Sequence, residues 1–281
     1  MELHVFFAVL AAAALHAGWN AVIKVSNDAF LSLTVIGVCG GLVAIPLVAV
    51  FGFPIAAAWP WLIASVIIHL GYYIFLSEAY RTGDLGAVYP IARGVAPMLT
   101  TLVGVLFLNE RVSPGAAAGI VFVIAGVMML SLARGEALKR LDRRALAFAL
   151  GTACTVSAYT FADGYGGRIS GNAHAYASAL FVVDGAFLGL FAFWRRGRAV
   201  TDAMAYHWKP GLLGGAMSLA AYWIAIWAMS VAPIPMVATL RETSVLFAAL
   251  IATYILREGF HWARIAAAVV VVAGVGLIRF G

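Results

Sequence analysis

The sequence predicts an all-α integral membrane protein with ten transmembrane helices. Its hydrophobic fraction is 64%, its charged fraction is 11% and its mean hydropathy is +1.00, whereas soluble domains are roughly 45–50% apolar and about 25% charged. About ten apolar stretches of roughly 20 residues, the length that crosses the hydrocarbon core, fit between the few charged clusters. A charged pattern also recurs at one fixed interval, which indicates a duplicated unit. Lipid therefore surrounds most of the chain, and almost nothing is left over for a soluble catalytic domain.

The first apolar run follows Met-Glu-Leu-His, which lacks the basic n-region of a cleaved signal peptide, so we expect a mature first helix there. Five apolar runs precede a basic linker at residues 134–144 and five follow it, which divides the chain into repeats at 1–133 and 145–281. The expected spans are approximately 4–24, 29–51, 58–80, 86–109, 113–132, 145–162, 172–193, 210–229, 234–256 and 262–279.

The recurring pattern is an arginine, then a glutamate, then a glycine in an apolar helix. The matching positions lie 148 residues apart and are Arg93 and Arg241, Glu110 and Glu258, and Gly126 and Gly274. Because each half has an odd number of spans, a shared fold requires the second half to be inverted relative to the first. Equivalent helices then face a common central cavity, which is an arrangement typical of secondary transporters.

These residues resemble a known family. Residues 79–129, which read AYRTGDLGAVYPIARGVAPMLTTLVGVLFLNERVSPGAAAGIVFVIAGVMM, are similar to the end of an EamA domain of the drug/metabolite transporter superfamily, and residues 228–278 contain a second copy. In the second copy, Leu256-Arg257-Glu258 corresponds to Leu108-Asn109-Glu110 of the first, and Ala273-Gly274 corresponds to Ala125-Gly126. The resemblance implies two inverted five-helix EamA repeats, movement of small metabolites, often efflux of amino acids or related compounds, and cytoplasmic termini.

Loop charges indicate the opposite orientation. The odd-numbered loops carry thirteen Lys and Arg residues and the even-numbered side carries Arg111, Arg168 and Arg279. Under the positive-inside rule the odd loops face the cytoplasm and both termini face outward. This tally also accounts for most of the formal net charge of +6 without a nucleic-acid partner. Loop charge thus predicts termini outside the cytoplasm, and the family resemblance implies termini inside it.

Two polar stripes are predicted to face the central cavity. One is on the first helix and the other is on its counterpart, the sixth, and each has members four residues apart on one helical face. Hydrogen bonding between helices is the alternative reading. The stripes are His16, Asn20 and Lys24, and Thr155, Tyr159 and Asp163.

Arg93 and Arg241 are expected at equal depth beside helix-breaking prolines, Pro90 and Pro97 in one half and Pro233 and Pro235 in the other. A guanidinium binds carboxylate or phosphate in a fork geometry, which favours an anionic or zwitterionic substrate. The alternative is internal neutralisation by Glu78, Asp184 or Glu242. Glu110 and Glu258 are expected to hold helix turns, with Arg111 and Arg257 as partners.

Aromatic side chains are also candidates for the cavity wall, because they can stack on a ring or enclose an ammonium group of a substrate. The alternative is that they only pack between helices. Candidate coupling residues are Glu78, Asp163 and His69. Candidate cavity residues are Arg93, Arg241, His16, Trp19, Asn20, Lys24, His69, Tyr73, Tyr89, Tyr159, Asp163, Tyr222 and Glu242.

The sequence thus predicts a secondary transporter, in the exporting direction, for a small amino-acid-like, anionic or zwitterionic metabolite that moves by alternating access. The alternative is proton-coupled efflux of cationic or aromatic compounds; the small four-helix relatives implied by the resemblance use a carboxylate in their first helix, which this chain lacks. An enzyme is disfavoured because HExxH, GxSxG and GxGD motifs are absent from the sequence. A channel is disfavoured by the duplication. We expect no cofactor and no metal, a multi-pass protein of the inner membrane, possible proton coupling, and a monomer or homodimer.

Overall fold

The computed structural model of the chain describes residues 1–23, 28–82, 85–132, 142–254 and 262–281. Within these ranges the regular structure is helical. The elements are α1 (Leu3–Ile23), α2 (Ala29–Phe51), the short 3₁₀ helix η1 (Ala56–Ala58), α3 (Trp59–Thr82), α4 (Leu85–Leu108), α5 (Pro114–Leu132), α6 (Arg143–Ile169), α7 (Ala173–Arg196), α8 (Arg198–Val231), α9 (Ile234–Arg241), α10 (Ser244–Tyr254) and α11 (Trp262–Phe280).

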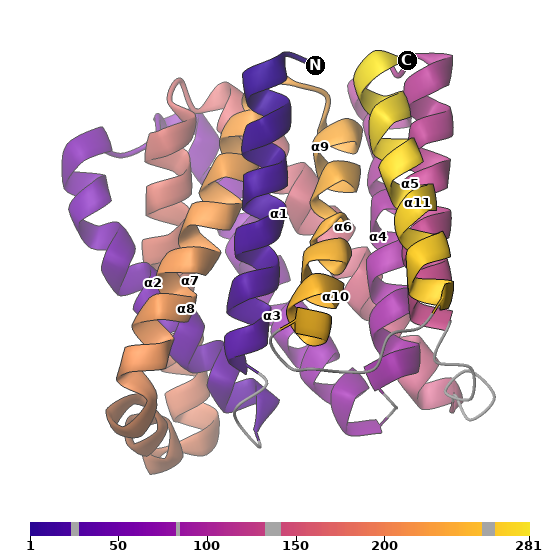
Figure 1. Cartoon of the computed structure of the whole chain (residues 1–281). Coiled ribbons are helices and arrows are strands. Elements are labelled where there is room, and N and C mark those ends of the chain that lie inside the picture. Colours follow the sequence, from indigo (N-terminus) through magenta and orange to yellow (C-terminus); the bar gives the residue numbers. More distant parts are fainter. Residues whose placement is uncertain (24–27, 83–84, 133–141, 255–261) are drawn as a thin grey trace.

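The helices form one bundle in which successive elements cross back and forth (Figure 1). In the described ranges, eight segments are long and apolar enough to span a membrane, with α9 and α10 counted as one, and Pro114–Met129 and Ile265–Phe280 are two shorter apolar helices. Both termini lie at the same end of the bundle (Figure 1). The sixth crossing, α6, therefore begins at the end opposite to that of α1. The predicted fold of ten spanning helices with an inverted second half is confirmed.

Short polar and glycine signals set the helix ends. Asp28 precedes α2 and accepts a hydrogen bond from the Leu31 amide at 3.1 Å, and Asn172 caps α7 in the same way. Such caps satisfy amides that lack a partner inside the helix. Gly197 ends α7 with a φ of 52°, which a residue with a Cβ adopts only at a cost.

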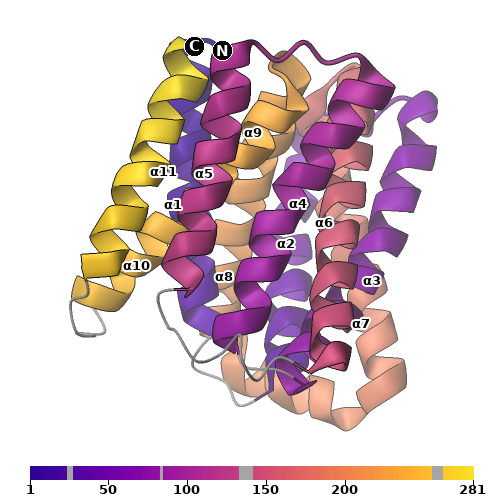
Figure 2. The same cartoon turned by 90° about the vertical axis from the view of Figure 1, so that its right-hand side faces the viewer.

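Helices α5 and α11 pack together at one edge of the bundle (Figure 2). A Cβ added to Gly119 would lie 2.6 Å from the Gly274 carbonyl oxygen, and one added to Gly274 would lie 2.7 Å from the Gly119 oxygen. The two backbones are therefore in direct contact, as in membrane helix pairs built on small residues.

Three spans differ clearly from the sequence prediction, and one of them is α6, which continues to Ile169 rather than ending near 162. Helix α8 begins at Arg198 rather than near 210, because it continues through a kink at His207 and across Pro210. The span predicted at 234–256 is interrupted after Arg241, and Pro233 and Pro235 stand at its start instead of breaking it. By contrast α4 is continuous through Pro90 and Pro97. The two halves therefore differ where their arginines lie.

Candidate functional site

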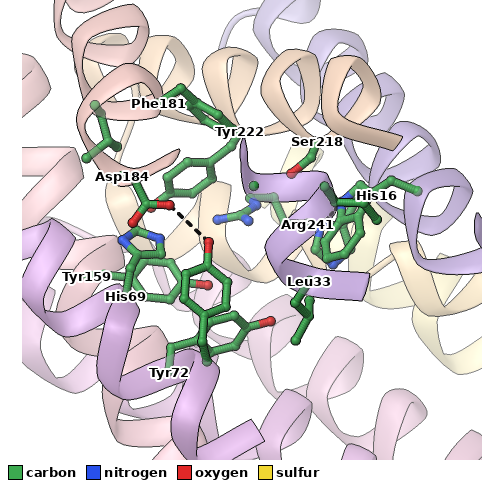
Figure 3. A pocket seen from close by; sticks show the side chains of 15 residues that line it. His16, Leu33, His69, Tyr72, Tyr159, Phe181, Asp184, Ser218, Tyr222 and Arg241 are labelled. Carbon is green, nitrogen blue, oxygen red and sulfur yellow. Dashed lines mark hydrogen bonds between the residues drawn. The ribbon is translucent and has the colours of Figure 1, made fainter. Parts of the chain in front are cut away.

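A cavity lies between the halves of the bundle (Figure 3). Its volume is about 80 Å³. Helices α1, α2 and α3 of the first half and α6, α7, α8 and α9 of the second half contribute to its wall. The lining residues are His16, Trp19, Leu33, Ile36, Gly37, His69, Tyr72, Tyr73, Tyr159, Leu180, Phe181, Asp184, Ser218, Tyr222 and Arg241.

Aromatic rings form one side of this cavity. His69 stacks on Tyr159 with ring centroids 4.0 Å apart and an interplanar angle of 18°. Tyr222 meets Tyr159 edge-on at 5.8 Å, and Tyr72 does the same at 5.7 Å. Such a wall offers ring faces and hydroxyl groups to a bound molecule. It is therefore suited to a flat or cationic group as well as to an apolar one.

Arg241 provides the positive charge of the cavity. It is the last residue of α9, at the helix break, and its guanidinium carbon lies 4.7 Å from the centroid of the Tyr222 ring (Figure 3). Among the residues that the structure describes, no carboxylate lies within 4.0 Å of its guanidinium nitrogens. The guanidinium therefore presents donors to the cavity without a salt-bridge partner from the described part of the chain.

Asp184 provides a carboxyl group in the same cavity. It lies near the middle of α7, and one of its oxygens accepts a hydrogen bond of 3.0 Å from the Tyr73 hydroxyl on α3 (Figure 3). This bond connects the two halves of the chain. The cavity thus contains both a guanidinium and a carboxylate that do not pair with each other.

Arg93 has a different environment from Arg241. Its Nε lies 2.8 Å from Oε2 of Glu242, and its Nη2 donates to Ser244 Oγ at 2.8 Å. The contact between Arg93 and Glu242 is an ion pair but not a hydrogen bond, because the Nε–H of Arg93 does not point at the Glu242 oxygen. The two charged side chains are only 13% and 7% exposed. Arg93 is therefore neutralised across the halves, between α4 and the α9–α10 break.

A smaller pocket of about 10 Å³, the scale of a single water molecule, adjoins this ion pair. Arg241 lines this pocket as well as the main cavity. The other lining residues are Arg93, Ala96, Pro97, Thr100, Val156, Thr160, Ala238 and Glu242.

Asp163 lies behind the cavity wall rather than in it. The residue is fully buried, and its two oxygens accept hydrogen bonds from Tyr176 at 3.0 Å and from Tyr222 at 2.6 Å. A carboxylate that accepts from two hydroxyl groups is one way in which a buried charge is satisfied.

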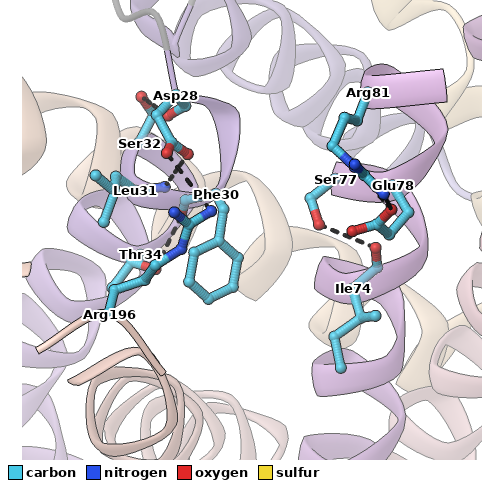
Figure 4. Close-up of polar contacts among 10 residues, drawn as sticks. All are labelled: Asp28, Phe30, Leu31, Ser32, Thr34, Ile74, Ser77, Glu78, Arg81 and Arg196. Carbon is cyan, nitrogen blue, oxygen red and sulfur yellow. Dashed lines mark hydrogen bonds and ion pairs between the residues drawn. The ribbon is translucent and has the colours of Figure 1, made fainter. Parts of the chain in front are cut away.

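Several predicted site residues are placed outside the cavity wall. The Asn20 side chain donates to the backbone oxygen of His16 at 2.8 Å, within its own helix. Glu78 pairs with the exposed Arg81, one turn further along α3, at 2.7 Å (Figure 4). Lys24 and the side chain of Tyr89 lie outside the described part of the structure. Trp19 and His16 do line the cavity and contact each other at 3.3 Å.

Some lining residues were not among the sequence candidates. Asp184 is the clearest case, because a single carboxylate inside an apolar span is itself a signal for a site. Phe181 and Ser218 carry no such signal, since aromatic and small polar residues are common in spans. Glu110 was also expected to pair with Arg111, but Arg168 occupies that place, with Nη1 2.6 Å from Oε1. Arg168 also donates to backbone oxygens at the end of α8, which fixes its position.

The described residues contain no group of three His, Cys, Asp or Glu side chains arranged to hold a metal ion. The cavity offers a guanidinium, a carboxyl group and aromatic rings for the recognition of a bound molecule.

Known proteins resemble this chain at several levels. A segment is 40% identical over 81 residues to the multidrug resistance protein EbrB of Bacillus subtilis (strain 168), which is 28% of this chain and 68% of that protein. A segment is 33% identical over 64 residues to the nicotine metabolites export pump subunit NepA of Paenarthrobacter nicotinovorans, or 23% of this chain and 55% of that protein. One solved crystal structure covers 97% of this chain and 94% of its own with a TM-score of 0.72, and at 18% identity it supports the fold alone.

The model of the EamA-like transporter family matches twice, at residues 4–132 and 143–280. Together the two matches cover nearly the whole chain. The sequence resemblance to this family is therefore confirmed, and so is a multi-pass location in a membrane. This chain is a membrane transporter that belongs to the EamA-like transporter family.

Proposed function

We propose that this transporter exports a small zwitterionic metabolite by alternating access, and that Arg241 binds the carboxylate of that molecule. The observation that carries the proposal is the Arg241 guanidinium, which faces the cavity with no carboxylate of the described residues within 4.0 Å. A cation at membrane depth is costly unless water or a ligand solvates it. An anionic group of the substrate meets that requirement.

Asp184 is the proposed partner of the ammonium group. Its carboxylate lines the same cavity and is hydrogen-bonded by only one hydroxyl among the described contacts, that of Tyr73. The ring faces of Tyr72 and Tyr159 supply further affinity for a cationic or flat group. A molecule with both charges matches both groups, whereas a plain anion leaves Asp184 without a counter-charge.

Arg93 is proposed to hold the helix break rather than the substrate. Its ion pair with Glu242 and its bond to Ser244 engage the guanidinium from two sides. In a rocking motion of the two halves, this contact lies where the halves meet.

Efflux of aromatic cations is the second candidate function. Asp184 and the surrounding rings favour it, and the matched relatives include a protein named for multidrug resistance. The positive charge of Arg241 in the same cavity opposes it, because like charges repel strongly where water is scarce.

Transport into proteoliposomes that contain the purified protein separates these functions. The panel consists of amino acids, carboxylic acids without an amine, amines without a carboxylate, and ethidium as an aromatic cation. We expect saturable uptake and counterflow with an amino acid, and loss of both in Arg241→Gln. The matched control is Arg195→Gln, because Arg195 also lies over a ring, that of Phe30 at 5.6 Å, but at an exposed site. Uptake of ethidium with no uptake of any zwitterion would favour the second function.

A further inference from the structure

We propose that Asp163 is a positioning residue, which holds Arg241 in the cavity through the ring of Tyr222. The inference rests on the proposed function only for its effect on transport. The link itself, from Asp163 to Tyr222 to Arg241, is a property of the protein alone.

The first step of the link is the hydrogen bond from the Tyr222 hydroxyl to Asp163. At 2.6 Å it is short, and both residues are buried. Hydrogen bonds to an ionised acceptor are shorter and stronger than neutral ones. The second oxygen of Asp163 is held by Tyr176 at 3.0 Å, so the carboxylate cannot rotate away without losing a second bond.

The fold makes room for this arrangement on α6. A Cβ added to Gly166 would lie 2.6 Å from the Tyr176 hydroxyl, so the glycine one turn after Asp163 lets that hydroxyl approach the helix. The site is thus built to hold the carboxylate in one orientation.

The second step is the contact between the Tyr222 ring and Arg241. The guanidinium carbon lies 4.7 Å from the ring centroid, which is within the range of a cation–π interaction. Tyr159 and His69 meet the ring at steep angles, 84° and 81°. The hydrogen bond to Asp163 fixes the hydroxyl of Tyr222, and the rings of Tyr159 and His69 restrict the orientation of its ring. Tyr222 therefore holds the guanidinium of Arg241 in one position.

All the groups in this link come from the second half of the chain. Asp163 is on α6, Tyr176 on α7, Tyr222 on α8 and Arg241 at the end of α9. Asp163 does not line the cavity, so it acts on a substrate through residues that do, and of its two hydrogen-bond donors Tyr222 is the one that contacts Arg241. This role differs from the coupling role that the sequence suggested.

Two variants distinguish positioning from a general structural role. Tyr222→Phe and Tyr176→Phe each remove one hydroxyl from the same carboxylate, but only Tyr222 contacts Arg241. A merely structural role predicts the same effect from both. A positioning role predicts a clearly larger effect on Arg241 from Tyr222→Phe than from Tyr176→Phe, which loosens Asp163 but leaves the hydrogen bond from Tyr222 in place.

The first measurement needs no substrate. Purified protein is treated with phenylglyoxal, which modifies arginine, and the rate at Arg241 is followed by peptide mass spectrometry with Arg93 as the internal reference. We expect the Arg241 rate to rise at least about threefold in Tyr222→Phe, the effect of a ring loosened by one lost hydrogen bond. In Tyr176→Phe it stays within about twofold of the parent. Equal rates in the two variants, or no change in either, would overturn the proposal.

The second measurement is transport of the amino acid that the parent protein carries. Tyr222→Phe is expected to raise KM about tenfold with kcat little changed, because one hydrogen bond to a charged group is worth that much. Tyr176→Phe leaves KM within about twofold. If the parent carries no zwitterion, the proposed function fails and the phenylglyoxal rates still decide this inference. A thermal melt of each variant confirms that both are folded.

Discussion

Replacement of Arg93 by Gln tests the ion pair that joins the two halves. Arg93 and Glu242 are 13% and 7% exposed, so water screens their contact little. Removing one partner of such a pair leaves the other charge buried and costs about 3–5 kcal/mol. The bond from Arg93 Nη2 to Ser244 Oγ is lost as well. We expect Arg93→Gln to lower the free energy of unfolding by about 3 kcal/mol or more.

The double variant provides the decisive comparison. Arg93→Gln with Glu242→Gln removes both charges and leaves two amides in reach of each other, so its loss should be smaller than that of either single variant. The coupling free energy should therefore reach at least about 2 kcal/mol. The assay is reversible unfolding in mixed micelles with rising dodecyl sulfate, followed by circular dichroism, with Arg195→Gln as the exposed control. Additive losses, or an Arg93→Gln loss below about 0.5 kcal/mol, would refute the reasoning.

Three further predictions concern packing, the α4 end and orientation. Gly274→Ala should lower stability by about 1–3 kcal/mol, because its Cβ meets backbone atoms at 2.7 Å; Gly276→Ala, which meets nothing within 4 Å, should be neutral or slightly stabilising in the same unfolding assay. Glu110→Gln should lower the melting temperature because it breaks the 2.6 Å contact with Arg168, whereas Arg111→Gln should not; equal shifts would argue against this pairing. An alkaline phosphatase fused to the C-terminus should be active, because this enzyme works outside the cytoplasm. The loops rich in Lys and Arg are predicted to face the cytoplasm, and the termini are predicted to lie on the opposite side of the membrane. Fluorescence of a green fluorescent protein fused there would place the termini inside instead.

Most of the fold was predictable because membrane spans are set by length and charge. Observed bounds such as Ala29–Phe51 match the expectation, and most others differ by a few residues. Helix α8 was predicted too short: the expected span began at 210, whereas the chain there kinks at His207 and remains helical across Pro210. A proline in a membrane helix is tolerated when neighbouring groups satisfy the freed backbone, and the sequence does not show those neighbours.

The site was predictable only in part. The repeat makes Arg93 and Arg241 equivalent in position, although only Arg241 is followed directly by a glutamate, Glu242. Their environments differ because α9 ends at Arg241 and the turn that follows brings Glu242 to Arg93. This turn contains neither glycine nor proline; Thr243 stabilises it by donating to the Leu240 oxygen at 2.6 Å. Asp184 was named only as a partner for arginine, since its position in the cavity depends on the packing of α7 against α2 and α3.

The central claim is that Arg241 recognises a substrate carboxylate, and a comparison of one transported amino acid with its carboxamide tests it most directly. Competition in proteoliposomes gives the ratio of the two apparent affinities for the parent protein and for Arg241→Gln. A bidentate contact between a guanidinium and a carboxylate is worth about 1.5–3 kcal/mol, or a preference of roughly tenfold to a hundredfold. The parent should show that preference for the acid, and Arg241→Gln should show less than about threefold. An unchanged preference in Arg241→Gln would contradict the account.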